Sequence, residues 1–335
     1  MSSDKFQFDE IDRLVATSLQ VNGRAGWGHI ARVLDLPERT VSRRGQRLLE
    51  SGSVRVSTSI DSTKVAHARP MLLRIRTDMG RVWPVARSLA SRPDASSVSI
   101  LEGANEIGAM LMLRNATEIR SLLFETLPLT EGILHTSATT VLRFFRTGHD
   151  WYPPFLSPDQ VRDLREDLEE APSMDRSQEI VLTSDEEAVI SALQSDGRMS
   201  VKSIAEQLTI APGTAKRRVD SLLQRGILHV RTEVVPSLFG FGLEVLIWLK
   251  APTARMSAVG TALAQHSAVK FCAAATGTSM IWVNGLFKDE SDFYDFLTGP
   301  FFVEHPEVDV VESLVVLTPV LRGSLHVDDG PWIDD

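Results

Sequence analysis

The sequence contains one cysteine, Cys272, and eight histidines among its 335 residues. A single cysteine excludes an internal disulfide bond and a metal site built on several cysteines. The histidines show no HxH or HExxH spacing, so we expect no metal site and no bound cofactor. The sequence also lacks P-loop, GxSxG and GxGxxG segments, which are common signs of nucleotide binding or catalysis.

Long apolar runs are missing as well. The segment VLIWL at 245–249 is far too short to span a bilayer. The first ten residues, MSSDKFQFDE, contain no apolar run of the kind that signal peptides carry. We therefore expect a cytoplasmic protein that binds no membrane, and its length favours two or more domains.

Acidic residues outnumber basic ones, and the formal net charge is -9. Residues 157–180 carry eight acids and three arginines, and residues 326–335 carry four aspartates and no lysine or arginine. These two segments account for the whole net charge. By contrast, residues 37–55 hold five arginines and two glutamates, and residues 200–231 hold six basic and two acidic residues. Such local positive segments are compatible with nucleic-acid binding by an acidic protein.

The chain contains an internal repeat with an offset of 174 residues. Residues 19–52 align with residues 193–226 without a gap, and 13 of the 34 positions are identical. The same offset places Leu89 on Leu263 and Gly103 on Gly277. The repeat predicts a tandem duplication of one two-domain unit.

Each unit begins with three short helical patterns, a glycine and a strand, the order of a winged helix-turn-helix. Alternating strand and helix patterns follow in the order βαββαβ, which is typical of a ferredoxin-like domain. We therefore predict an α+β fold with two winged helix-turn-helix domains and two ferredoxin-like domains in tandem. The predicted helix-turn-helix domains span 1–60 and 181–233, the ferredoxin-like domains 68–148 and 243–322, an acidic linker helix 149–180, and an acidic tail 323–335.

These patterns resemble the leucine-responsive/asparagine regulator (Lrp/AsnC) family. The shared pattern is IA-x-x-L, then T-x-x-RR, then LL-x-x-G, then a glycine-led turn between the middle strands, and it occurs twice. The resemblance implies a transcription regulator whose C-terminal domain senses a small molecule, often an amino acid. Two departures concern the third helix: Pro37 and Ala211 stand where a capping Ser is usual, and Gly45 is an interior helix position where the repeat has Val219. We expect these choices to loosen the first head.

The third helix of each head is the predicted DNA-reading element. A charge run is often only a solvated helix face, but here the basic residues lie on the third helix in both copies. Residues near the helix start are expected to reach bases or phosphates, whereas Arg44 and Arg218 could instead brace the head. The candidate DNA-binding residues are Arg39, Thr40, Ser42, Arg43, Arg44, Arg47, Gly213, Thr214, Lys216, Arg217 and Arg218.

The two glycine turns are the predicted effector site. They could equally be plain hairpin turns, because Gly and Asn accept positive φ. The family resemblance favours an effector pocket between the ferredoxin-like domains. Glu106 is the proposed partner for an ammonium group, and the second turn has Met280 in its place. The candidate ligand-binding residues are Gly103, Asn105, Glu106, Gly277, Thr278 and Ser279.

The leading prediction is a sequence-specific regulator that binds double-stranded operator DNA and a small-molecule effector, possibly an amino acid, as a homo-oligomer. Two alternatives stay open: an enzyme similar to the sirohaem decarboxylases, and an architectural DNA-binding protein without an effector. The decarboxylases carry histidine and arginine motifs in the body, whereas the strands SVSILEGANEIGAML and KFCAAATGTSMIWVN contain neither residue. We therefore expect no catalytic residue and no enzyme activity.

Overall fold

The computed structural model describes residues 8–65, 68–103, 105–166, 180, 182–278, 280–323 and 325–327. Residues 167–179 of the predicted linker helix, most of the acidic tail (328–335) and the candidate ligand residue Ser279 lie outside the described residues. No helix in the described ranges is long and apolar enough to cross a membrane.

The first head contains three helices and a strand. A capping box between Asp9 and Asp12 starts the first helix, and Pro37 precedes the third without a side-chain cap, as predicted. The helices bury one apolar stripe each, including Leu19, Ile30 and Leu48. The elements are α1 (Glu10–Val21), α2 (Trp27–Leu34), α3 (Glu38–Glu50) and β1 (Val54–Ile60), followed by the short α4 (Ser62–Val65).

The second head has the same order of elements. Thr183 and Glu186 form the capping box of its first helix, and Ser200 caps the second helix. Ala211 precedes the third helix and provides no side-chain cap. The elements are α9 (Ser184–Ser195), α10 (Val201–Gln207), α11 (Pro212–Gln224) and β6 (Leu228–Val234).

The two wing strands join the heads. β1 and β6 form a two-stranded antiparallel sheet in which Ser57 lies opposite Arg231, its counterpart at the 174-residue offset. Arg24 Nη1 donates to the carbonyl of Gly197 at 2.5 Å, and Arg198 Nη1 donates to the carbonyl of Gly23 at 2.5 Å. A Cβ on either glycine would come within 3.0 Å of the opposite wing, so this reciprocal contact requires glycine. The repeated residues thus lie across a local two-fold relation.

The body is a closed ring of eight strands, which corrects the prediction of two separate ferredoxin-like sheets. The strand order β3-β4-β2-β5-β8-β9-β7-β10 closes because β10 also pairs with β3, and the short β11 extends β10. The last strand of each half crosses to the other half: β5 pairs with β8, and β10 with β3. The strands are β2 (Arg69–Thr77), β3 (Ala95–Leu101), β4 (Glu106–Leu113), β5 (Ile133–Arg146), β7 (Leu243–Lys250), β8 (Val269–Ala275), β9 (Ile281–Phe287), β10 (Asp309–Arg322) and β11 (Leu325–His326).

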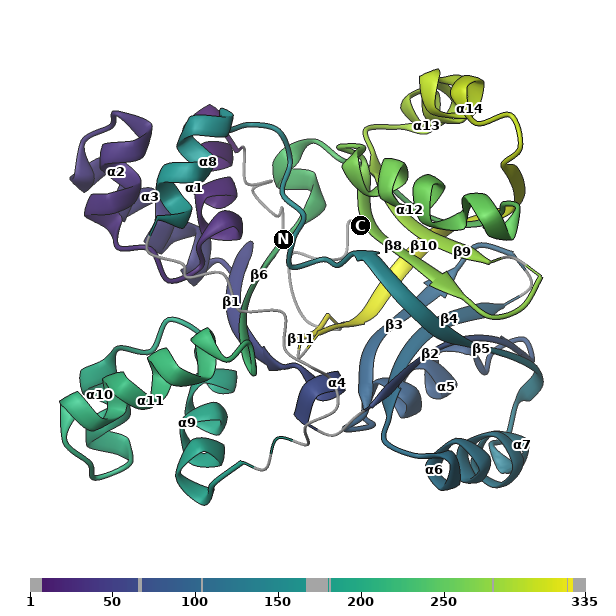
Figure 1. Ribbon diagram of the computed structural model, residues 1–335, viewed down its shortest axis with the longest axis horizontal. Coiled ribbons are helices and arrows are strands. Elements are labelled where there is room, and N and C mark those ends of the chain that lie inside the picture. Colours follow the sequence, from purple (N-terminus) through teal and green to yellow (C-terminus); the bar gives the residue numbers. More distant parts are fainter. Residues whose placement is uncertain are drawn as a thin grey trace.

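Helices cover the outside of this barrel, and the two heads lie beyond the wings on the opposite side (Figure 1). The first half is covered by α5 and its following helical turns, and the second by α12 to α14. An inner apolar cluster that includes Leu72, Trp248 and Trp282 fills part of the barrel. The covering elements are α5 (Val82–Ala90), α6 (Ala116–Ser121), η1 (Leu122–Thr126), α7 (Leu127–Leu129), η3 (Thr253–Arg255), α12 (Met256–Gln265), α13 (Glu290–Thr298) and α14 (Pro300–Glu304).

Two connecting elements pack against the first head. α8 (Pro158–Arg165) begins with a capping box between Ser157 and Gln160 and buries Val161 and Leu164. η2 (Pro236–Phe239) adds Leu238 and Phe239 to the same cluster. The described part of the predicted linker is therefore a packed helix on the first head.

Candidate nucleic-acid interface

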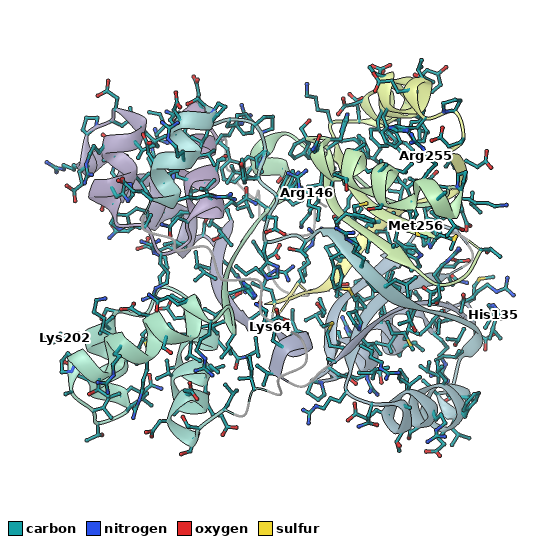
Figure 2. All side chains as sticks on the ribbon, in the orientation of Figure 1. Lys64, His135, Arg146, Lys202, Arg255 and Met256 are labelled. Atoms are coloured by element: carbon teal, nitrogen blue, oxygen red, sulfur yellow. The ribbon has the colours of Figure 1, made fainter. Side chains whose placement is uncertain are left out.

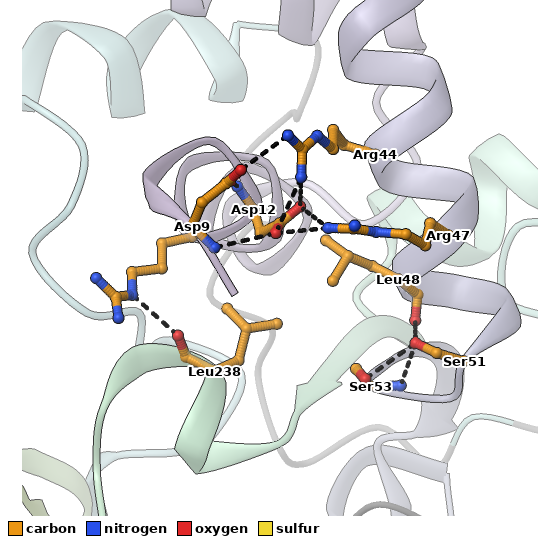
Figure 3. Close-up of polar contacts among 9 residues, drawn as sticks. Asp9, Asp12, Arg44, Arg47, Leu48, Ser51, Ser53 and Leu238 are labelled. Carbon is orange, nitrogen blue, oxygen red and sulfur yellow. Dashed lines mark hydrogen bonds and ion pairs between the residues drawn. The ribbon is translucent and has the colours of Figure 1, made fainter. Parts of the chain in front are cut away.

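Arg44, the second arginine of the RR pair on α3, and the nearby Arg47 both bind acidic residues at the start of α1. Arg44 Nη2 lies 2.8 Å from Asp9 Oδ2, and Arg44 Nη1 lies 3.3 Å from Asp12. Arg47 Nη2 donates to the same Asp12 carboxylate at 2.6 Å, as Figure 3 shows. The Asp12 side chain is fully buried, so both arginines balance its charge and tie α3 to α1. Arg44 and Arg47 therefore both brace the head, and their contact with DNA stays a prediction.

The RR pair on α11 is divided in the same way. Arg218 forms an ion pair with Asp185 at the start of α9, whereas Arg217 is exposed. Lys216 pairs with Asp220 one turn along the same helix, with 68% of its side chain exposed. Since this pair lies on the surface, Lys216 can exchange its partner for a phosphate at small cost.

The remaining predicted residues lie on the outward surface of the third helices. Arg39 and Arg43 on α3 and Arg217 on α11 are exposed, and no ion pair with another described residue involves their side chains. Arg43 and Arg217 occupy equivalent positions in the repeat. Thr40, Ser42 and Thr214 are half-buried, and Gly213 is exposed with open space beside it. Each head thus presents one matched arginine and a small polar surface to solvent.

Gly45 has a packing role that the sequence alone did not indicate. A Cβ at this position would lie 2.3 Å from the Trp27 ring. The guanidinium of Arg198, from the second head, lies over the same Trp27 ring, 4.4 Å from its centroid. Gly45 thus makes room for an indole that joins α2, α3 and the second head, and the expectation that this glycine loosens the first head stays a prediction.

The glycine turns lie at the two seams of the barrel. Gly103 and Gly277 have φ of +113° and +105°, as expected for glycine turns, and Asn105 has φ of +55°. The backbone of Glu102 donates to Val315 across one seam, and Thr276 donates to Thr140 across the other, next to exposed Thr278.

Glu106 is engaged in the barrel. Arg74 Nη2 donates to Glu106 at 2.5 Å, Arg74 Nη1 donates to Glu312 at 2.5 Å, and the guanidinium lies 4.5 Å from the Trp248 ring centroid. Burial lowers the pKa of Arg74, but the hydrogen bonds to Glu312 and Glu106 outweigh that effect and raise it overall. The two carboxylates therefore stabilise the charged guanidinium. The assignment of Glu106 as an ammonium partner is therefore revised, because the carboxylate already balances Arg74.

A cavity of about 1300 Å³ lies between the wings and the barrel mouth. Its walls include the wing residues Ser59 and Arg231, the serines of β3, and the aromatic Phe271 and Trp282. No motif in the sequence marks this cavity, because its residues come from many segments that lie far apart in the chain. The described members of the predicted turn site do not line it.

A cluster of charged side chains borders this cavity. Arg231 pairs with buried Glu233, and Lys270 Nζ lies 3.6 Å from the same carboxylate. Arg322 pairs with Glu244, whose Oε1 accepts from Asn284 Nδ2 at 2.9 Å. Burial raises the pKa of Glu233, but Arg231 and Lys270 outweigh that effect and hold it well below its usual range.

The second head matches a known protein family. A family described as winged helix-turn-helix DNA-binding matches residues 186–228. An uncharacterised HTH-type transcriptional regulator of Pyrococcus abyssi is 28% identical over 148 residues, which cover 44% of this chain and 94% of that protein. The HTH-type transcriptional regulator FL11 of Pyrococcus horikoshii is 27% identical over 116 residues, 34% of this chain and 77% of that one. The chain is related to HTH-type transcriptional regulators.

A solved structure matches the whole architecture. The siroheme decarboxylase NirDL has a TM-score of 0.60, covers 97% of this chain and 96% of its own, and is 13% identical in sequence. The prediction that the chain is not an enzyme is contradicted by this match, because an enzyme has the same arrangement of heads and barrel. The middle strands of the body contain no histidine or arginine. The structure instead places His149, His229 and Arg231 at the cavity from other segments.

Proposed function

We propose that the chain is a sequence-specific transcription regulator that binds double-stranded DNA through α3 and α11. The observation that carries this proposal is the matched division of the two RR pairs. In each head the second arginine binds an acid on the first helix, and the first arginine is left on the exposed surface. This division leaves an exposed arginine on the outward surface of each third helix, the element with which helix-turn-helix proteins contact phosphates and base edges.

The net charge of -9 does not oppose this function. Phosphate contacts depend on the local field at the third helices, and electrostatic interactions between exposed groups are screened beyond about 8–10 Å at physiological salt. The bracing acids Asp12 and Asp185 are each balanced by an arginine. The exposed Arg43 and Arg217 therefore remain as net positive charges on the outward surface.

DNA binding should be measured by fluorescence anisotropy on the fragment upstream of the protein's own gene, at several salt concentrations. Replacing Arg43 and Arg217 together with Ala should weaken binding and lower the salt slope by about two, roughly one for each lost phosphate contact. The control is the double variant Arg120→Ala and Arg255→Ala. It removes the same charge from the helices that cover the barrel, and Arg255 lies far from the heads in Figure 2. Equal affinity and salt slope in the two double variants would refute the assignment.

The whole-chain match supports a second candidate, an enzyme that acts on a carboxylated tetrapyrrole in the cavity. A related solved structure holds an iron-uroporphyrin III analogue, and it covers 95% of this chain with a TM-score of 0.58 and 14% identity. Incubation with siroheme followed by mass spectrometry tests this candidate directly. Loss of carboxyl groups from siroheme would support it, and unchanged siroheme would count against it.

A homo-oligomer remains a prediction. Its support is the exposure of apolar side chains on the last strand of each half, Leu134 and Leu142 on β5 and Val311 and Leu317 on β10. An interface on either strand would remove this apolar surface from water. Sedimentation velocity would show whether the chain self-associates.

A further inference from the structure

We propose that the cavity between the wings and the barrel binds a small aromatic carboxylate, and that this ligand is the effector of the regulator. The inference rests on the proposed regulatory function for its consequence, but the binding site stands on its own geometry. It replaces the glycine turns as the sensing site.

The cavity has one aromatic wall and one cationic wall. Phe144, Phe271, Leu246 and Trp282 line the side that opens into the barrel. Phe144 and Phe271 meet edge to face with centroids 5.8 Å apart, and Trp282 meets Trp248 at 4.9 Å. Ligand sites are mostly apolar with a few placed polar groups, and a rigid aromatic wall favours a flat ring.

The cationic wall brings three positively charged side chains to the cavity, those of Arg231, Lys270 and Arg322. Arg231 and Lys270 lie beside the Glu233 carboxylate, and Arg322 pairs with Glu244. Glu233 lies behind the wall, because the cavity is lined by the three cations and Glu244 but not by Glu233. A ligand carboxylate would accept charge-assisted hydrogen bonds from these cations.

Lys270 is the cation whose pKa would respond most to a bound carboxylate. Burial lowers the pKa of Lys270, and its neighbours Arg322 and Arg231 lower it further, against the opposing effect of Glu233 and Glu244. An added carboxylate would favour the charged ammonium. The other acids on the cavity lining have partners of their own: Asp61 lies 3.7 Å from Lys64, Asp94 pairs with Arg92, Asp150 accepts from Thr147, and Glu118 accepts from the Arg114 backbone.

Polar surface from the first half completes the site. Ser97 and Ser99 of β3 line the cavity together with Ser59 of the first wing. They hold no charge, whereas the charged cluster comes from the second half. The chain therefore has one asymmetric site, and we expect one ligand per chain.

The position of Arg231 connects this site to the heads. Arg231 lies on β6 directly opposite Ser57 of β1, at the centre of the wing pair that joins the heads. A ligand that draws the guanidinium towards the cavity acts on that strand pair. We therefore expect the ligand to change DNA affinity, because it favours one arrangement of the wings.

Calorimetry on the full chain tests the site with indole-3-acetate and 1-naphthoate, against their neutral amides. The expected result is one carboxylate per chain and at least tenfold weaker binding of each amide. Lys270→Gln should weaken the carboxylate at least tenfold and leave the amide unchanged. Ser99→Phe, which keeps every charge but fills space, should weaken both. Lys250→Gln is the matched control, since it makes the same change at an exposed lysine that ends β7 and lies outside the cavity lining.

Folding of each variant is checked by its circular dichroism and melting temperature. The comparison of each carboxylate with its amide uses the wild-type protein and so does not depend on any variant. Equal binding of carboxylate and amide, or no binding of either carboxylate, would overturn the proposal. Binding of uroporphyrin III but of neither small carboxylate would also overturn it and would favour the enzyme candidate. If the carboxylate binds but the chain does not bind DNA, the site stands and the regulatory function fails.

Discussion

The two heads contain the same helices, but they are stabilised differently. The first buries Asp12 between two arginines and packs Trp27 over Gly45. α8, η2 and residues Leu325 and Val327 add to its apolar cluster. The second head has Val219 at the position of Gly45 and holds its third helix by surface ion pairs from Asp185 and Glu186.

This difference shows that a weaker helix can belong to the better-anchored head. α3 has no cap and contains an interior glycine, both unfavourable for an isolated helix. Tertiary contacts offset that cost, because most helix stability in proteins comes from packing. The second head depends more on its own residues, so the two heads are expected to respond differently to the same kind of substitution.

The largest expected effect is at the buried acid. Asp12→Ala leaves the guanidinium groups of Arg44 and Arg47 without their shared carboxylate, and we expect a loss of about 3 kcal/mol in the free energy of unfolding. The value is at the low end for a broken buried pair because 39% of the Arg47 side chain is exposed. The control Asp185→Ala breaks a pair whose acid is 61% exposed, and should cost at most about 0.5 kcal/mol. Urea unfolding followed by circular dichroism measures both, and equal losses would remove the distinction between the heads.

Gly45→Ala tests the sign of the packing argument. Helix propensity alone predicts stabilisation by about 1 kcal/mol. The clash with Trp27 predicts the opposite, a loss of about 2 kcal/mol. Gly213→Ala on α11 is the matched control, because nothing lies within 4 Å of its added Cβ and the change should be neutral or slightly stabilising. If Gly45→Ala is more stable than the wild type, the Trp27 ring moves aside without loss of stability.

A smaller effect is expected where the two halves meet at the cavity. His149 of the first half lies 5.7 Å from His229 of the second, measured between ring centroids, and 3.1 Å from Ser59 Oγ. Burial, with Arg231 and His229 nearby, lowers the pKa of His149 to about 4. The unfolded chain therefore takes up a proton first as the pH falls, and stability decreases below pH 6.5 until the folded protein also protonates near pH 4.

Between pH 7.5 and 5.5 this linkage should cost about 1.4 kcal/mol of unfolding free energy. His149→Asn should remove that part of the pH dependence and leave the contribution of other groups unchanged. The measurement is urea unfolding of both proteins at the two pH values. If both proteins show the same pH dependence of stability, protonation of His149 is not its cause.

Local signals in the sequence were sufficient for the order of elements. The capping residues Ser157, Thr183 and Ser200 lie at helix starts, and helical spacing of apolar residues marks α1 and α3, because caps and periodicity act within one or two turns. The repeat also identified equivalent residues: Arg24 and Arg198 exchange the same backbone bonds across the wings.

Only the tertiary structure decided which side chains act together. Strand patterns do not specify a partner, so closure of the barrel through β5 with β8 and β10 with β3 depended on packing of the whole inner cluster. Arg44 and Arg43 are adjacent and chemically identical, and only the buried Asp12 on another helix separates a bracing role from an exposed one. The cavity draws on Ser59, Lys270 and Arg322, which come from three distant segments. A charge is worth most where burial removes water, and burial is a property of the assembled fold rather than of the local sequence.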